Sequence, residues 1–184
     1  PFLEKVDNWN RFNENTGGTL VEKCCHFFDL MNLIVPSKPI KVYASGGQDV
    51  NHLDEKYDGK TPDIIDNSFV IIDYQDGQRA MLDLCMFAEA GKYEQEIVLT
   101  GDQGKLETYI PGNELILTNR KNDSLKTIVV KDDPRVKEVG FHHGASYIEH
   151  LELIDCIKNK KKPLVDCQKG LDSIILGLAA QESI

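Results

Sequence analysis

A succession of short β-type segments joined by tight turns constrains the fold of this chain more than any other feature. Residues 68–74 and 79–87 flank a turn in which Asp76-Gly77 supplies the positive φ angles that a hairpin needs. Further strands are expected over residues 40–44, 96–100, 105–110, 114–118 and 127–130. Consecutive strands joined by such short turns must run antiparallel. The centre of the chain therefore predicts an antiparallel sheet.

Helical spacing of apolar residues predicts helices on both sides of this strand region. One helix is expected over residues 19–35, a second over residues 146–159 with Ser146 and Glu149 as a capping box, and a third from about residue 168 to the C-terminus. The residues expected to face inward are Ile148, Leu151, Ile154 and Ile157 in the second helix and Leu171, Ile174, Ile175, Leu178 and Ala179 in the third. This order predicts an α+β fold, an open, mostly antiparallel β-sheet with helices packed on one face.

The length of 184 residues corresponds to about one domain, so we expect a single domain over residues 1–184 and exclude a complete two-domain enzyme. The predicted helices leave one face of the sheet uncovered. A partner subunit is the natural candidate for that face. Residues 45–62 are polar and irregular, and they predict a long surface loop.

Charge and cysteine content exclude several classes of partner. The 21 Lys and Arg residues against 30 Asp and Glu give a formal net charge of −9, which disfavours binding to nucleic acid or to an anionic membrane. No apolar stretch approaches the roughly 20 residues of a membrane span, and no signal peptide is recognisable, so we expect a cytoplasmic protein. The five cysteines are scattered and form no CxxC pair, which argues against a disulfide framework or a zinc site.

The first predicted helix carries polar side chains on an otherwise apolar stripe. Glu22, His26 and Asp29 lie at i, i+4 and i+7 and therefore share one helical face. A carboxylate one turn before a histidine can accept a hydrogen bond from one ring nitrogen and leave the other to exchange a proton with a substrate. The spacing fits a general acid/base pair, but spacing alone favours a solvated edge beside a partly buried structural histidine.

The segment GGTLVEKCCHFFD, from Gly17 to Asp29, resembles the Gly-Gly-x-Leu-x-Asp-x-x-x-His-x-x-Asp signature of the Gfo/Idh/MocA oxidoreductases, the family of glucose-fructose oxidoreductase and inositol dehydrogenase. Other segments resemble the family in the same order. They are the hairpin over residues 69–83, the turn 100–104 within residues 97–107, and the closing helices over residues 151–163 and 170–183. The resemblance spans nearly the whole chain.

The resemblance implies a C-terminal domain whose N-terminal partner domain is absent from this chain. Family members join a Rossmann domain, which binds NAD or NADP and carries a Glu-Lys-Pro lysine, to a second domain that binds substrate and packs sheet against sheet in dimers and tetramers. Neither a Gly-x-Gly-x-x-Gly fingerprint nor a Glu-Lys-Pro motif occurs here, so cofactor-binding residues in this chain are unknown. We expect the missing domain to bind NAD or NADP and the isolated chain to be inactive. The resemblance also implies a homodimer or homotetramer that forms through the sheet face.

By the same resemblance, His26 matches the histidine that acts as general acid/base on the substrate hydroxyl or carbonyl. Glu22 matches the acidic position one turn earlier, which is usually Asp, and Asp29 matches a later acidic position that we interpret as structural. His143 lies where the family often has a histidine near the substrate, although a simple loop histidine fits as well.

The residues before the signature add candidates for substrate binding. Trp9, Arg11 and Asn15 combine an aromatic ring with polar groups, which suits the apolar face and the hydroxyls of a polyol. Trp9 fits a core position equally well. No short ligand spacing supports a metal site, so we expect none.

Together these observations predict the substrate-binding and dimerisation domain of an NAD(P)-dependent oxidoreductase that acts on a CH–OH group of a sugar, inositol or related polyol. The alternative is a non-catalytic ligand-binding or protein-interaction module on the same scaffold. A third interpretation is a complete protein that works only by assembling through its sheet.

Overall fold

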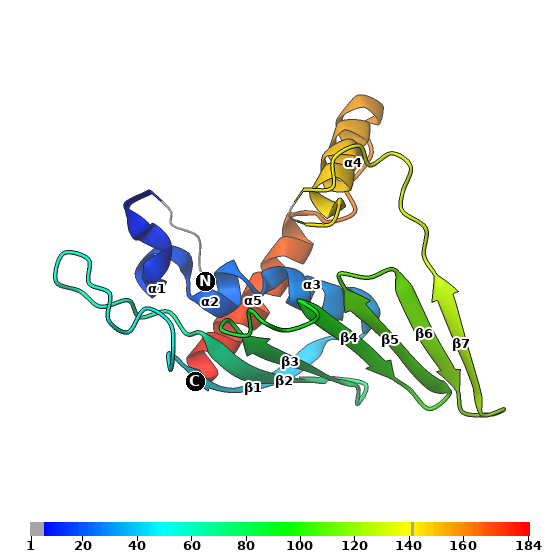
Figure 1. Ribbon diagram of the computed structural model, residues 1–184, viewed down its shortest axis with the longest axis horizontal. Helices are drawn as coiled ribbons and strands as arrows, with labels where there is room; N and C mark the ends of the chain where they lie inside the picture. The colour runs from blue at the N-terminus through cyan, green and yellow to red at the C-terminus, as the bar shows by residue number, and fades with distance from the viewer. Residues whose placement is uncertain (1–5, 141) are drawn as a thin grey trace. The chain divides into compact units, whose positions relative to one another are not determined.

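The computed structural model describes residues 6–140 and 142–184, and it confirms an α+β fold with antiparallel strands (Figure 1). The strands form two sheets, where the sequence pattern suggested one. A three-stranded sheet has the order β1-β2-β3, and a four-stranded sheet has the order β4-β5-β6-β7. The chain divides into two compact units. The first combines the residues up to Glu89 with Leu164–Ile184, and the second is Ala90–Pro163.

The sheet of the first unit is a meander of neighbouring strands. These are β1 (Pro39–Gly47), β2 (Asn67–Tyr74) and β3 (Arg79–Cys85). The predicted hairpin between β2 and β3 is confirmed, with Gly77 of its turn at φ 89°. β1 runs past the predicted end at Ala44, because Gly46 and Gly47 still pair with β2.

Helices cover one face of this sheet. They are α2 (Thr19–Glu22), α3 (Cys25–Ile34) and α5 (Cys167–Ser183). Alternate residues of β2 and β3 are buried, as expected for an antiparallel sheet with one covered face. The core between the two layers includes Leu20, Cys24, Phe28, Ala44, Val70, Ile72, Leu82, Leu84, Leu176 and Ala180. The predicted packing of helices on one sheet face is confirmed in this unit.

The single helix predicted over residues 19–35 is interrupted. α2 ends at Glu22, α3 begins at Cys25, and Lys23 and Cys24 form a turn with φ angles of −102° and −106°. The apolar spacing continues across this turn, so the sequence pattern looks the same with or without the interruption.

α5 buries a different face from the predicted one. Its buried residues are Ser173, Leu176, Gly177 and Ala180, whereas Leu171, Ile174, Ile175 and Leu178 are exposed. The reason is the close approach of α5 to α2. A Cβ atom on Gly177 would lie 2.7 Å from the backbone oxygen of Leu20, so only a residue without a side chain fits there.

The second unit contains its own antiparallel sheet and one helix. The elements are β4 (Gln95–Thr100), β5 (Gly104–Ile110), β6 (Glu114–Asn119), β7 (Ser124–Val129) and α4 (Ala145–Asn159). The capping box predicted at Ser146 is wrong, because the chain enters α4 through Gly144 in the left-handed conformation, at φ 88°. Ile154 and Ile157, predicted to face inward, are exposed, and no residue of α4 is buried.

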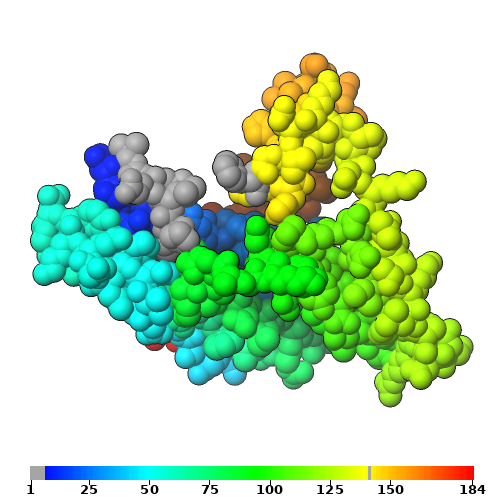
Figure 2. Space-filling model, in the orientation of Figure 1, coloured from blue at the N-terminus to red at the C-terminus, as the bar shows by residue number. Residues whose placement is uncertain are grey.

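The loop over residues 48–66 lies against the N-terminal segment of the first unit, which comprises η1 (Val6–Arg11) and α1 (Asn13–Thr16). Figure 2 shows the loop, in cyan, beside the blue N-terminal segment. The Asp63 carboxylate accepts a hydrogen bond from the Asn13 backbone N–H at 2.7 Å. The predicted surface loop is thus fastened to the segment that carries the candidate substrate-binding residues.

Glu55 is the centre of a polar cluster that ties this loop to Arg11. Its Oε2 accepts hydrogen bonds from Arg11 Nε at 3.1 Å and from the Tyr57 hydroxyl at 2.8 Å, and its Oε1 lies 2.7 Å from His52 Nδ1. Burial alone would raise the pKa of Glu55, but hydrogen bonds from His52, Tyr57 and Arg11 outweigh it and lower the pKa from 4.5 to about 2. Because Glu55 is ionised at neutral pH, His52 Nδ1 must donate the proton of its contact.

Gly177→Ala should destabilise the first unit, although alanine favours a helix by about 1 kcal/mol relative to glycine. The added methyl group would meet the Leu20 carbonyl, and such overpacking costs about 1–3 kcal/mol. Gly170→Ala in the same helix is the matched control, because no atom lies within 4 Å of a Cβ there, and it should be neutral or stabilising. Urea unfolding measures both. A Gly177→Ala variant as stable as the parent would contradict the close approach.

Glu55→Gln should lower the free energy of unfolding at pH 7 by about 2 kcal/mol, because it removes the negative charge that faces three hydrogen-bond donors. The folded pKa of about 2 lies below the ordinary 4.5, so the ionised carboxyl stabilises the native state above pH 4.5, and this stabilisation is lost as the pH falls towards 2.

The variant should therefore lose part of the acid dependence of stability between pH 4.5 and 2. Glu14→Gln is the matched control, since the Glu14 pair with Lys60 is exposed and should contribute less than about 1 kcal/mol. Equal stability of Glu55→Gln and the parent, measured by urea unfolding across this pH range, would reject the assigned role of Glu55.

Candidate active site

His26 lies at the start of α3, just after the turn that follows α2. Its side chain is exposed, and its ring packs against the Phe27 ring with 4.2 Å between centroids. Its neighbours Cys24 and Phe28, by contrast, are fully buried. The imidazole is therefore displayed on the outer side of a helix whose inner side is anchored in the core, and it is not the partly buried histidine that the spacing also allowed.

Glu22 is the last residue of α2, and only 20% of its side chain is exposed. Its Oε1 lies 2.8 Å from Nζ of Lys23, whose side chain is 31% exposed. The turn after Glu22 means that Glu22 and His26 do not share one continuous helix, as the sequence spacing predicted. The structure instead places them on either side of the same helix junction.

Cys24 lies beneath this junction. Burial raises the pKa of its thiol to about 12, Cys25 and Glu22 add to the rise, and Lys23 opposes it. The thiol is therefore protonated at neutral pH and is a packing group rather than a nucleophile.

The three substrate-binding residues predicted before the signature differ in exposure. Trp9 is 38% exposed, so it is not the core residue that its type also allowed. Asn15 is exposed, and its Nδ2 donates a hydrogen bond to the Trp9 carbonyl at 3.1 Å. Arg11 is 3% exposed, and its guanidinium is held by Glu55. Sequence reasoning missed Glu55 because the loop that carries it has no periodic pattern.

His143 belongs to the second unit. Its Nε2 lies 3.3 Å from a carboxylate oxygen of Glu94, and its backbone has a left-handed φ of 52°. Among non-glycine residues this conformation is uncommon. The structure thus gives His143 an acidic neighbour within its own unit.

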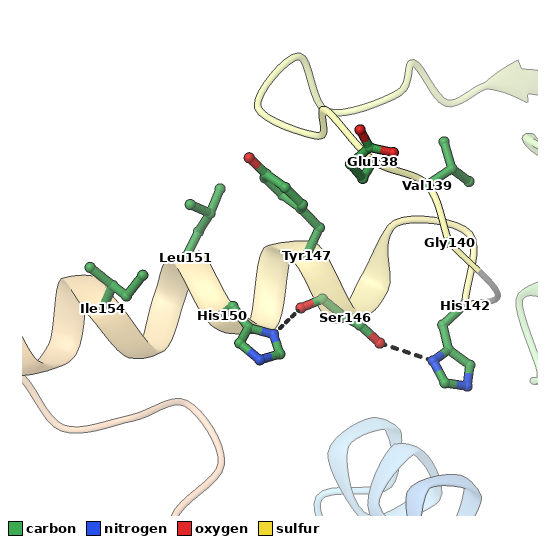
Figure 3. Close-up of a pocket in the computed structure, with 9 residues that line it drawn as sticks. All are labelled: Glu138, Val139, Gly140, His142, Ser146, Tyr147, His150, Leu151 and Ile154. Atoms are coloured by element: carbon green, nitrogen blue, oxygen red, sulfur yellow. Dashed lines mark hydrogen bonds between the residues drawn. The ribbon is translucent and has the colours of Figure 1, made fainter.

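A groove of about 490 Å³ lies beside the first turns of α4 (Figure 3). Tyr147 and Leu151 contribute apolar surface to it. The His150 Nδ1 donates a hydrogen bond to the Ser146 carbonyl at 2.6 Å, and the His142 Nδ1 lies 2.9 Å from the Ser146 hydroxyl. Ser146, which the sequence suggested as a helix cap, instead orients two imidazoles at this groove.

The described residues offer no recognisable cofactor or metal site. Over residues 6–140 and 142–184, no group of three or more His, Cys, Asp or Glu side chains could hold a metal ion. Gly101 and Gly104 close the hairpin between β4 and β5, where a phosphate-binding turn would need a following helix. Gly18 precedes α2, where its φ of 97° favours glycine, and α2 with its four residues is too short to offer a phosphate site at its N-terminus. These turns do not fit a dinucleotide.

No helix in the described ranges has the length and apolar character needed to cross a membrane. All five cysteines are free thiols.

Comparison with solved structures shows which folds are similar. An oxidoreductase domain protein from Kribbella flavida has a TM-score of 0.76 and 18% identity, with 93% of this chain and 49% of that chain covered. The UDP-N-acetylglucosamine 3-dehydrogenase GnnA from Acidithiobacillus ferrooxidans has a TM-score of 0.70 and 13% identity, with 90% and 47% covered. The WlbA dehydrogenase from Bordetella pertussis, in complex with NADH and UDP-GlcNAcA, has a TM-score of 0.64 and 16% identity, with 95% and 45% covered.

The TM-scores show a shared fold, and this chain spans about half the length of the structures that it matches. A comparison with curated proteins gave no match. Among protein families, GFO_IDH_MocA_C, described as "Oxidoreductase family, C-terminal alpha/beta domain", matches residues 1–184. Because this match covers the entire sequence, the chain belongs to the Gfo/Idh/MocA oxidoreductases and represents the C-terminal alpha/beta domain of that family.

Proposed function

We propose that this domain binds the substrate of an NAD(P)-dependent oxidoreductase that acts on a CH–OH group of a sugar, inositol or related polyol. The observation that carries the proposal is the exposed His26 at the α2–α3 junction, with Glu22 beside the same turn. The substrate class is supported by the names of similar structures, since GnnA is a dehydrogenase of UDP-N-acetylglucosamine and WlbA was crystallised with UDP-GlcNAcA.

In this proposal His26 acts as the general base. One ring nitrogen accepts the proton of the substrate hydroxyl while the C–H bond of the same carbon breaks, which leaves a carbonyl group. Removal of the proton raises the electron density on the oxygen and favours departure of the hydride. The negative charge of Glu22 favours the imidazolium that forms on His26. The reverse reaction uses the same pair, with His26 as the acid.

NAD or NADP supplies the hydride acceptor. The glycine turns of the described residues do not fit a dinucleotide, so we assign its binding to residues outside this chain. On this proposal the 184-residue chain alone has no dehydrogenase activity, and the complete enzyme is cytoplasmic. WlbA, with its bound NADH, supports a nicotinamide cofactor for this fold.

Trp9 and Asn15 are the residues of the first unit that we assign to substrate contact. The partly exposed indole of Trp9 can stack on the apolar face of a sugar ring, and the exposed amide of Asn15 can bond to its hydroxyls. Arg11 is buried, so we assign it to holding this segment through Glu55. For His143, which has Glu94 beside it in the second unit, substrate contact stays a prediction from the resemblance.

His26→Asn should lower kcat by at least about 100-fold, because it removes the proton acceptor. The affinity for NAD(P)H should stay unchanged, since other residues hold the cofactor. The assay uses the complete gene product with polyol substrates, and His150→Asn, another exposed histidine, is the control with near-parental activity.

Near-parental turnover by His26→Asn would reject the catalytic assignment. A parent protein that binds a sugar or polyol but transfers no hydride would favour the non-catalytic ligand-binding module instead.

The uncovered face of the three-stranded sheet supports the second part of the proposal, association with another copy of this chain. Strand register places Tyr43, Ile71 and Met81 in one row across the sheet, with exposures of 58%, 41% and 63%. Phe69, 56% exposed, lies on the same face in the next row, opposite Asp83. We call these four residues the apolar sheet face. They are adjacent to one another, and a contiguous apolar patch marks an interaction surface, which single exposed apolar residues do not.

Charges at the two ends of the apolar sheet face favour a second copy as its occupant. The row Lys41, Asp73 and Arg79 has a net positive charge at one end, and Asp83 lies at the other. A two-fold axis can bring the basic end of one copy over the acidic end of the other, so the face is complementary to itself. A homodimer, or a tetramer built from it, would cover the apolar row.

Ile71→Asp should convert the associated chain to a monomer, because it places a charge at the centre of the apolar sheet face. Light scattering after size exclusion measures the mass. Ile174→Asp on α5 is the matched control, since Ile174 is 39% exposed and should tolerate the charge without loss of association. A monomeric parent, or an Ile71→Asp variant with parental mass, would reject this interface.

A further inference from the structure

The contact between Glu22 and Lys23 is one that a regular helix does not make. Consecutive helical side chains point about 100° apart, so residues i and i+1 do not face each other. Here α2 ends at Glu22, and Lys23 begins the turn that leads to α3. The 2.8 Å ion pair between Lys23 Nζ and Glu22 Oε1 therefore belongs to this turn.

The surroundings of this ion pair differ from those of a surface pair. Only 20% of the Glu22 side chain and 31% of the Lys23 side chain are exposed, compared with 64% and 67% for the Glu14–Lys60 pair. The Glu22–Lys23 pair also adjoins Cys24, which is fully buried and whose thiol is influenced by both charges. A partly buried carboxylate depends on its counter-charge more than an exposed one does.

We propose that Lys23 is a positioning residue for the Glu22–His26 pair: its ammonium group holds one oxygen of the Glu22 carboxylate and so orients the other towards the His26 imidazole. This inference rests on the proposed role of His26 and adds a residue to it. Lys23 acts through Glu22 and does not touch the substrate.

The length of the Glu22 side chain explains why a second residue is needed to position its carboxylate. Glutamate has one more rotatable bond than aspartate, so its carboxylate samples more positions unless something holds it. A carboxylate can accept hydrogen bonds on both oxygens, and occupation of Oε1 by Lys23 leaves Oε2 for the imidazole. The cation thus restricts a side chain that is too long to be fixed by its own geometry.

Kinetics of Lys23 variants in the complete gene product test this inference. Lys23→Met keeps the length of the side chain and removes its charge, and it should lower kcat by about 10- to 100-fold, with KM changed by less than about twofold, because the loss is one of orientation. Lys23→Arg keeps the charge and should remain within about threefold of the parent. Lys60→Met, which breaks the exposed pair with Glu14, is the matched control and should be parental.

A double variant separates orientation from folding. Glu22→Gln with Lys23→Met removes both charges and leaves neither one buried alone, and it should be no slower than Glu22→Gln by itself. The inference is overturned if Lys23→Met keeps kcat within twofold of the parent, if Lys23→Arg is as slow as Lys23→Met, or if the two losses multiply in the double variant. His26→Asn distinguishes a wrong role for Lys23 from a wrong proposed function. If His26→Asn lowers kcat and Lys23→Met does not, only the role of Lys23 is rejected.

Discussion

The close approach of α5 to α2 is the constraint on which the rest of the first unit depends. Gly177 of α5 leaves room for the backbone of Leu20, and Gly18, directly before α2, lies against the Gln181 side chain of α5. Leu20 then joins the core together with Leu176 and the sheet. Because α2 is fixed in this way and ends at Glu22, the position of the turn that leads to His26 follows from helix packing.

Local patterns made the strands predictable, whereas the packing of helices depends on distant residues. The β2–β3 hairpin follows from alternating apolar residues and an Asp-Gly turn, both of which act within a few positions. The face that α5 buries could not be read in the same way. Its larger apolar residues form the more conspicuous stripe, but the smaller face around Gly177 is buried because α2 comes so close. Helical periodicity identifies apolar stripes and does not say which one meets a neighbour.

Candidate residues that lie within the short signature could be predicted from the sequence. Contacts between segments far apart in the chain could not. Glu22 and His26 stand out by spacing and by resemblance, but the turn between them is invisible, since neither Lys23 nor Cys24 is a residue that breaks helices. Arg11 looked like a ligand-binding residue by its type alone. Its partner Glu55 lies 44 residues away in an irregular loop, and no pattern along the chain links the two.

Glu55 and Glu22 differ in how many of their carboxylate oxygens accept a hydrogen bond from other protein groups. Glu55 receives hydrogen bonds on both oxygens, from Arg11, His52 and Tyr57, and is therefore committed to holding the loop. The contact of Glu22 with Lys23 uses Oε1 and leaves the second oxygen as an acceptor. A histidine beside a committed carboxylate, such as His52, is a structural group. In the proposed function the proton is exchanged by His26, and Glu22, whose contact with Lys23 uses one oxygen, is the carboxylate assigned to it.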